Sequence, residues 1–581
     1  MKKIIFNISI LFLGLSMSLS CSVDRMPEAT LTDQFFWETP ENLRLAANFF
    51  YTGLPGLSSE DVTQDNWSSD GFPISGNNTI SDGSRVAPAQ DTLNYRRNYY
   101  NIYQANKLIE MAPQVISRGG SETLVNSYVG EARFFRALFY FDMFCRYGGV
   151  PLIDRTVDED DPAIFLARSS REELINFIYA DLDYAIQHLR TIDELTAAQE
   201  YGRISVSGAL AFKSRVALFE GTRAKFHGYG DYRRHLTLAA DAARQVIESG
   251  AHSLFSQPSS GANGQRLNPA YYNLFQLVGN GLNNRENIII RGYGASLENL
   301  VSWHIAQRYY EGLQIVATQN FVNNYLMADG LPIGKSPMYR APNEQMTHAQ
   351  YFEGKDPRMS FTFFKRGDAF IASGPFVLPH PNNQRSGFAI RKYADPQAWA
   401  FQRSVIDRPV LRYAEVLLNY AEAKFELEEA IADADLDQTI NALRARLPQI
   451  NTGTAVAPNY TDLPKLSNAF VGAHSLSMRE EIRRERRVEL AFEMLGYWDF
   501  IRWKTAEVEF PKALVGSYFF TEYRTAPQPW NPQNTVVDQN NHIVLQPSSV
   551  RNFNPERDYL WPLPLDELAN NPGVIQQNPN W

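Results

Sequence analysis

Long segments with helical periodicity constrain the fold of this chain more than any other feature. Between Tyr95 and Gly250, apolar residues recur at intervals of three and four along five such segments, and a second helical region extends from Asp407 to Lys504. This spacing places the apolar residues on one face of an α-helix, which another element has to cover. The first five predicted helices are Arg96 to Ile116, Leu124 to Tyr147, Ser170 to Arg190, Ser205 to Phe226 and Tyr232 to Ser249. The chain is therefore predicted to be mainly α-helical.

Two of these segments carry further signals in their residues. The helix from Leu124 to Tyr147 has aromatic residues on opposite faces, such as Phe134 and Phe135, so we expect it to be buried on most sides. The following helix starts with Ser170 and has Glu173 three residues later, which is the pattern of a capping box.

Short connections between the predicted helices indicate stacked helical hairpins of the tetratricopeptide type. Small residues recur where partner helices would touch, namely Ala209, Ala211, Ala217, Ala414, Ala421 and Ala423. The scaffold is predicted mainly over residues 40–57, 95–250 and 407–504, and irregular loops over residues 58–94, 257–406 and 505–555. Long loops in a compact body are usually functional. We therefore expect one body over residues 21–581 whose loops form the ligand and partner surfaces.

The N-terminus has the pattern of an export signal. Two lysines precede an apolar run from Ile4 to Leu19, which is too short to span a membrane comfortably. Small residues then precede Cys21, as in lipoprotein leaders, so residues 1–20 are predicted to be a signal peptide and Cys21 the lipidated first residue. Two alternatives are a plain secretory signal and a disulfide with Cys145, the second of two cysteines. Cys145 lies in an apolar helical segment, where a cysteine is usually a small buried hydrophobe.

The composition is that of a globular protein with an acidic surface. Hydrophobic residues make up 44% of the chain, and the formal net charge is −9 at pH 7. This charge gives no indication of a nucleic-acid partner.

Familiar catalytic and metal-binding patterns are missing from the sequence. No two histidines have the spacing of a zinc site on one helical face, and there is no nucleophile elbow or phosphate loop. The acidic run from Val157 to Pro162 does not fit a calcium loop and is interpreted as a solvated loop. The helix with the sequence REEIRRERRVEL alternates arginine and glutamate, and Glu480 and Arg484 have the spacing of an ion pair. We interpret it as a structural ion-pair network, and we predict no catalytic residue, metal or cofactor.

Several segments are similar to the hallmark segments of the SusD/RagB family. They include EARFFRALFYFDMFCRYGGVPL, LRYAEVLLNYAEAKFEL, RRERRVELAFEMLGYWDFIRWK and the closing YLWPLPLDELANNPGVIQQNPNW. The similarity extends in order from Cys21 to Trp581, and on it the chain is identified as a member of this family.

The resemblance implies a function as well as a fold. Family members are outer-membrane lipoproteins of Bacteroidetes that face the cell exterior, are anchored through the residue that corresponds to Cys21, and have no catalytic activity. They cover a SusC-like TonB-dependent transporter and deliver nutrient to it, most often oligosaccharide. Two other readings stay open, a lid that handles peptides and a glycosidase whose paired carboxylates come together in space.

The resemblance also indicates where a glycan would bind. A sugar ring has an apolar face that packs on aromatic side chains and a rim of hydroxyls that needs polar partners. The family uses aromatics from an early loop and from the central loop region, which here gives Trp67, Phe72, Trp303, Tyr309 and Tyr310. Polar companions in the early loop are Asp70, Asn77, Asn78 and Arg85. Trp498, Trp503 and Trp561 lie in hallmark segments and are expected in the core.

Overall fold

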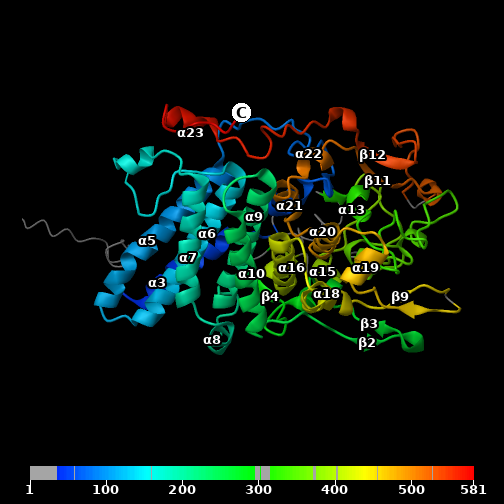
Figure 1. Cartoon of the computed structure of the whole chain (residues 1–581), viewed down its shortest axis with the longest axis horizontal. Coiled ribbons are helices and arrows are strands. Elements are labelled where there is room, and N and C mark those ends of the chain that lie inside the picture. Colours follow the sequence, from blue (N-terminus) through cyan, green and yellow to red (C-terminus); the bar gives the residue numbers. More distant parts are fainter. Residues whose placement is uncertain are drawn as a thin grey trace, which may run out of the picture.

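The computed structural model describes residues 36–57, 59–158, 160–294, 301–302, 315–370, 374–400, 403–454, 456–525 and 528–581. Long helices occupy one half of the molecule, and short helices, loops and strand pairs occupy the other (Figure 1). The predicted signal peptide and Cys21 lie outside the described residues. None of the described helices is long and apolar enough to cross a bilayer.

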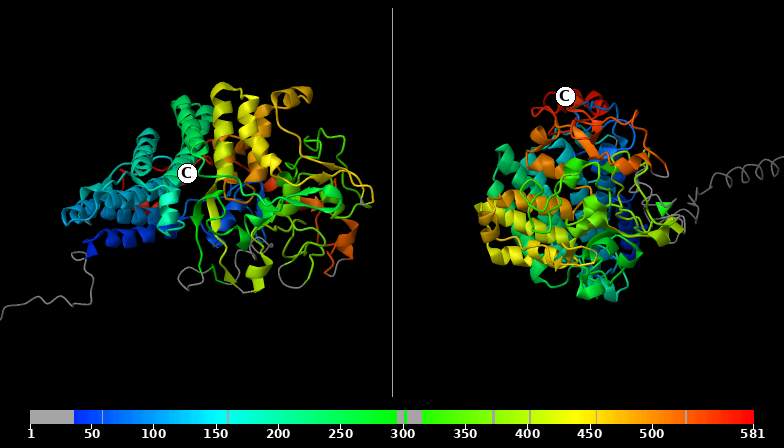
Figure 2. Two further views of the ribbon diagram at one scale, coloured as in Figure 1. Left: turned by 90° about the horizontal axis from the view of Figure 1, so that it is seen from below. Right: turned by 90° about the vertical axis from the view of Figure 1, so that its right-hand side faces the viewer.

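The scaffold half consists of helices packed against their neighbours in the chain, as the two views of Figure 2 show. Helix α5 packs on α6, α6 on α7, and α9 on α10, while α3 lies across α5 and α6. Their bounds are α3 (Pro40–Phe50), α5 (Arg97–Ser117), α6 (Glu122–Tyr147), α7 (Arg171–His188), α9 (Val206–His227) and α10 (Tyr232–Glu248). The five helices predicted between Tyr95 and Gly250 are confirmed to within two residues at each end. The arrangement confirms the predicted scaffold of helical hairpins.

Local signals explain how these helices begin and how deeply they pack. Ser170 caps α7: its hydroxyl accepts the backbone N–H of Glu173 at 3.1 Å, and its own N–H donates to the Glu173 carboxylate at 2.7 Å. This confirms the predicted capping box. Helix α6 is buried on most of its sides, as predicted. Cys145 near its end is buried, and burial raises the pKa of its thiol well above the ordinary value.

The second helical region is more broken than predicted. Its helices are α16 (Tyr413–Glu428), α17 (Asp433–Gln438), α18 (Ile440–Ala445), α19 (Asn468–Ala473), α20 (Met478–Glu489) and α21 (Gly496–Arg502). The region opens with a strand, β8 (Arg408–Arg412), which pairs antiparallel with β4 (Asn287–Arg291). A strand pair, β9 (Ile450–Asn451) with β10 (Tyr460–Thr461), lies between α18 and α19. Residues 407–504 were predicted to be mainly helical scaffold, and these two strand pairs are local departures from that pattern; β8 pairs with a strand that lies outside the region.

Two-stranded antiparallel pairs organise the loop-rich half. Besides β4–β8 they include β1 (Gly71–Pro73) with β6 (Ile315–Ala317), β2 (Ser259–Ser260) with β3 (Arg266–Leu267), β5 (Val301–Ser302) with β7 (Arg403–Ser404), and β11 (Leu514–Tyr518) with β12 (His542–Gln546). Short helices fill the spaces between them, among them α13 (Gln319–Val322), α14 (Pro357–Thr362), α22 (Ala506–Glu509) and α23 (Leu565–Asn570). A second hydrophobic core, rich in Phe and Tyr, lies beneath these loops.

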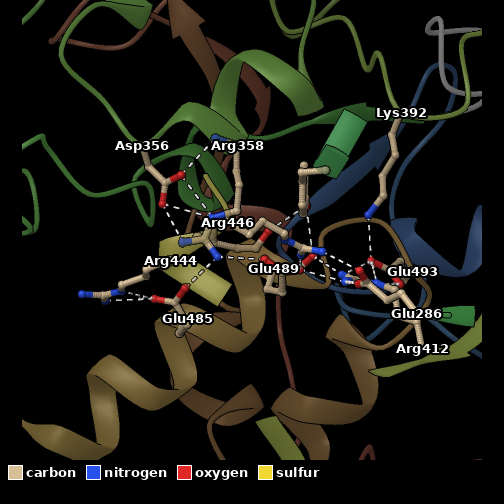
Figure 3. A network of polar contacts seen from close by, with 12 residues as sticks. Glu286, Asp356, Arg358, Lys392, Arg412, Arg444, Arg446, Glu485, Glu489 and Glu493 are labelled. Carbon is tan, nitrogen blue, oxygen red and sulfur yellow. Dashed lines mark hydrogen bonds and ion pairs between the residues drawn. The ribbon is translucent and has the colours of Figure 1, made fainter. Parts of the chain in front are cut away.

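A buried ion-pair network joins α20 to the loop-rich half (Figure 3). The Glu489 carboxylate on α20 accepts hydrogen bonds from Arg412 at 2.8 Å and Arg358 at 2.9 Å, and it also pairs with Arg446. One turn earlier, Glu485 pairs with Arg358 at 2.6 Å. All of these side chains are buried. Removing one member of such a network leaves uncompensated buried charge, so the network fixes α20 against α14, β8 and the segment that follows α18.

The arginine-rich helix is thus a structural ion-pair network, as predicted, but it is buried and uses different partners. Arg484 pairs with Glu481 at 3.2 Å, whereas Glu480 is exposed. The predicted pair between Glu480 and Arg484 is therefore wrong. Partners far away in the sequence, such as Arg358 and Arg412, could not be recognised from the helix alone.

Candidate functional site

The strand pair β1–β6 brings two distant loop segments together. Phe72 lies opposite Val316, and Pro73 lies opposite Ile315. Because the pair is antiparallel, the chain that follows Pro73 and the chain that precedes Ile315 leave it at the same end. The pair therefore joins the early loop to residues 315–317, which follow in the chain the segment from which Trp303, Tyr309 and Tyr310 were predicted.

A buried aromatic ring and a covering arginine form the centre of this end. Phe72 is fully buried, and the guanidinium carbon of Arg385 lies 4.6 Å from the centre of its ring. Arg385 also donates a hydrogen bond to the carbonyl oxygen of Gly76 at 3.1 Å. Its buried Nε has no hydrogen-bond partner among the described residues, and burial lowers the pKa of the side chain from its ordinary value. Arg385 thus holds the early loop in place and retains an unused donor.

A second loop, residues 379–387 with the sequence PHPNNQRSG, contains Arg385 and is linked to the early loop by its contacts with Phe72 and Gly76. The N–H groups of Asn382 and Asn383 donate to Nδ1 of His380 at 3.1 and 3.3 Å. The His380 ring is therefore neutral with its hydrogen on Nε2, and burial lowers its pKa. The side chain of Asn382 is exposed, and those of His380 and Asn383 are half-buried. We call residues 74–79 and 379–387 together the loop face.

The loop face is held rigidly from below. Gly387 has a φ of +78°, and a Cβ at this position would lie 2.0 Å from Oγ of Ser517 on β11. The N–H of Ser517 donates to the carbonyl oxygen of Ser386 at 2.7 Å, and Nε1 of Trp530 donates to that of Pro379 at 2.9 Å. Pre-ordered polar groups can bind a ligand without paying for their own ordering.

Most of the predicted early-loop residues have structural partners. Trp67 is half-buried, and its ring centre lies 5.0 Å from that of Trp561 and 5.8 Å from that of Tyr497. Asp70 is buried and forms an ion pair with Arg487 on α20. Burial raises the pKa of Asp70, although Arg487 opposes the shift. These contacts attach the early loop to the helices, so they favour a packing role for both residues.

Asn78 and Arg85 are also engaged within the protein. Asn78 is buried and donates to the carbonyl oxygen of Ser68 at 2.8 Å. Arg85 is buried between the rings of Trp561 and Trp581, 4.7 and 4.9 Å from their centres. Phe72, described above, has no exposed surface. These three side chains expose little surface to a ligand in this conformation. Sequence alone does not reveal which loop residues the fold covers.

Of the remaining predicted ligand residues, the structure describes one and leaves three outside the described residues. Asn77 is exposed on the loop face. Trp303, Tyr309 and Tyr310 lie outside the described residues, between β5 and β6. Their contact with ligand stays a prediction. Sequence reasoning missed residues 379–387, although a cluster of His, Asn, Gln and Arg beside two prolines in a loop-rich region was a usable signal.

The tryptophans expected in the core are divided between full and partial burial. Trp503 is buried, as predicted. Trp498 and Trp561 are half-buried, and with Trp67 they form an aromatic cluster at the junction of the early loop, α21 and the C-terminal segment. Among the residues that the structure describes, no three His, Cys, Asp or Glu side chains gather to hold a metal ion.

The fold places this chain among mainly α-helical proteins that have a scaffold of helical hairpins and a loop-rich half beside it. Residues 280–581, just over half of the chain, match the model of the SusD family. Residues 56–218 match a second model, described as "Starch-binding associating with outer membrane". The chain belongs to the SusD family, which confirms the resemblance found in its sequence.

Known relatives agree with this assignment. SusD-like protein P38 of Formosa agariphila is 24% identical over 518 residues, which cover 85% of this chain and 91% of that protein. A SusD-like carbohydrate-binding protein from Bacteroides fragilis superposes with a TM-score of 0.70 at 23% identity, covering 93% of this chain and 99% of that structure. A crystal structure with xylogluco-oligosaccharide superposes with a TM-score of 0.61 at 19% identity, covering 91% and 97%. The structural likenesses confirm the predicted fold.

Proposed function

We propose that this protein binds oligosaccharide at the loop face and delivers it to a SusC-like TonB-dependent transporter. Membership of the SusD family supports this proposal, as do the carbohydrate-binding relative from Bacteroides fragilis and the relative with xylogluco-oligosaccharide. The observation that carries it is the β1–β6 pair, which joins the early loop and the central segment beside Arg385.

The chemistry of the loop face suits a neutral sugar. Arg385, Asn77 and Asn382 provide donors and acceptors for hydroxyl groups, and Nε2 of His380 provides a further donor. Trp303, Tyr309 and Tyr310 precede Ile315 in the chain, and we propose that they supply the aromatic surface for the apolar face of the ring. We further propose that the protein acts as a binding protein and not as a glycosidase.

The proposed localisation rests on the leader and on the family. We propose that Cys21 is lipidated and anchors the protein in the outer membrane, facing the cell exterior. The name of the second matching model, which refers to association with the outer membrane, supports this proposal. The loop segments 257–406 and 505–555 are the proposed surfaces for the transporter, because the scaffold helices are covered by one another.

A titration of defined variants tests the proposed site. Oligosaccharides from starch, xyloglucan and other polysaccharides are screened against the wild type, and the best ligand is titrated by calorimetry. Arg385→Ala is expected to weaken binding roughly ten- to a hundredfold, since a hydrogen bond from a charged group contributes about 1.5–3 kcal/mol. Trp303→Ala is expected to weaken it similarly.

The control for this titration is Arg366→Ala, which removes an exposed arginine of the same loop-rich half outside the loop face. Its affinity should equal that of the wild type. Thermal unfolding of each variant separates loss of binding from loss of fold. Unchanged affinity in both Arg385→Ala and Trp303→Ala would remove the site from the loop face, and binding of peptides in place of sugars would favour the peptide alternative.

A further inference from the structure

A groove on the scaffold lies far from the loop face. It is bounded by α5, by the loop of residues 151–164 and by the C-terminal segment around α23, and its volume is about 270 Å³. In Figure 1, α5 and α23 lie at one end of the molecule, and β11 and β12, which support the loop face, lie at the other. A ligand in this groove would therefore occupy a site separate from the loop face.

Three tyrosines at four-residue spacing form one wall of the groove. Tyr95 lines it from the helical turn Thr92–Arg96 just before α5, and Tyr99 and Tyr103 line it from the first turns of α5. The ring centres of Tyr95 and Tyr99 are 5.0 Å apart, and the Tyr99 hydroxyl donates to the carbonyl oxygen of Pro151 at 2.7 Å. Tyr103 is 36% exposed. The inner two rings are thus fixed, and the third presents an accessible aromatic face.

An unmatched hydrogen-bond acceptor lines the groove at the C-terminal segment. Asn571 is 7% exposed, and its Nδ2 donates to the carbonyl oxygen of Glu567 at 3.2 Å. This hydrogen bond sets the orientation of the amide, because a flipped amide would bring two oxygens together. The buried Oδ1 then has no hydrogen-bond partner in the part of the chain that the structure describes. A buried acceptor of this kind is costly unless a donor reaches it.

The charges around the groove disfavour an anionic ligand. Arg96 pairs with Asp566, and Arg155 pairs with Asp161 through two hydrogen bonds. Glu567 also lines the groove, and burial together with Asp566 raises the pKa of its carboxyl from the ordinary value. Arg96 also lies 3.8 Å from the Glu567 carboxylate, so both arginines are paired with carboxylates, while the acceptors of Asn571 and Glu567 repel an anion. A ligand without negative charge that donates hydrogen bonds suits these acceptors.

We propose that this groove is a second carbohydrate site that takes a single sugar ring. The apolar face of the ring packs on Tyr103, and its hydroxyl groups donate to Oδ1 of Asn571 and to Glu567. The volume of the groove is large enough for one such ring and small compared with pockets for drug-sized molecules. This site does not depend on the loop face, and it would hold a chain end or a free monosaccharide at the scaffold.

Ligand-observed NMR with glucose, galactose, mannose and xylose tests the proposal. The wild type is expected to bind at least one of these sugars, and Tyr103→Ala and Asn571→Ala are each expected to weaken that binding at least tenfold. The matched control is Tyr100→Ala, which removes a tyrosine that is 56% exposed on the same helix but does not line the groove. Its binding should equal that of the wild type.

The outcomes separate this inference from the proposed function. Binding that survives in Tyr103→Ala but disappears in Arg385→Ala places the sugar on the loop face, which overturns the inference and supports the proposed function. Binding that is lost in Tyr103→Ala and kept in Arg385→Ala supports the inference, whether or not the loop face binds oligosaccharide. If none of the four sugars binds the wild type, the inference is wrong. Tyr103→Ala is decisive if Asn571→Ala does not fold, since Tyr103 is partly exposed.

Discussion

Glu489→Gln is expected to destabilise the protein more than any other change of one carboxylate to an amide on α20. The Glu489 side chain is fully buried and accepts from Arg412 at 2.8 Å and from Arg358 at 2.9 Å, besides its pair with Arg446. Glutamine keeps the shape but removes the charge, so three buried guanidinium groups lose their shared partner. Breaking a buried ion pair in this way costs about 3–5 kcal/mol.

The expected change in melting temperature follows from the size of the chain. At about 2.1 cal/mol/K per residue, unfolding of 581 residues has an entropy of about 1.2 kcal/mol/K. A loss of 3–5 kcal/mol therefore lowers the melting temperature by about 2.5–4 °C, which differential scanning calorimetry resolves. The control is Glu480→Gln, on the same helix but exposed, which should change stability by less than about 0.5 kcal/mol.

The pH dependence provides a second test of the same reasoning. Burial alone would raise the pKa of Glu489, but the charges of Arg446, Arg412 and Arg358 outweigh it and hold this pKa below the usual range. A carboxylate with a lowered pKa in the folded state contributes stability above the ordinary pKa of about 4.3, and loses it as the pH falls. The difference between wild type and Glu489→Gln should therefore shrink in acid. Equal stability of the two proteins at pH 7 would refute this account of the network.

Three further predictions concern the site and the anchor. Burial raises the pKa of Asp65 to about 7 against the opposing charge of Arg408, so its carboxyl is protonated in the folded state below that pH; the stability of the wild type relative to Asp65→Asn should fall from pH 5 to pH 8, and melting curves whose difference stays constant over this range would contradict this. Gly387→Ala should displace the loop of residues 379–387, because a Cβ there would lie 2.0 Å from Oγ of Ser517, and calorimetry should find oligosaccharide affinity at least tenfold lower; wild-type affinity would show that this loop is not needed. Cys21→Ala should appear in the soluble fraction, since each buried CH₂ of an acyl chain contributes about 0.8 kcal/mol to membrane attachment; a variant that stays on membranes lacking the transporter would exclude lipidation as the anchor.

The scaffold could be predicted from sequence because its signals are local. Amphipathic periodicity and caps such as Ser170 lie within each helix, so the bounds of α5, α6, α7, α9 and α10 could be predicted. The strand β8 could not be predicted in this way, because its pairing with β4 depends on residues about 120 positions away. The same distinction explains the arginine-rich helix, whose network was expected while its partners Arg358 and Arg412 were not.

The site was harder to predict than the fold. Trp67 is an aromatic residue in a polar loop, which is typical of a sugar-binding surface. In the structure it packs on Trp498 and Trp561, which lie more than 400 residues further along the chain. Phe72 is covered by Arg385, from a loop that the sequence marked only as irregular. Which loop aromatics are covered depends on contacts of this range, and no local pattern encodes them.

Hydrogen exchange of the wild type, with and without its best oligosaccharide, tests the central claim most directly. Bound sugar should slow exchange in peptides that cover residues 74–79, 301–315 and 379–387, because we propose that all three segments contact it. The β1–β6 pair joins residues 71–73 to residues 315–317, and Arg385 donates to Gly76 of the early loop. Exchange in the core of α6 and α9 should not change. Protection confined to other parts of the chain, with these three segments unaffected at saturating sugar, would contradict the assignment of the loop face as the binding site.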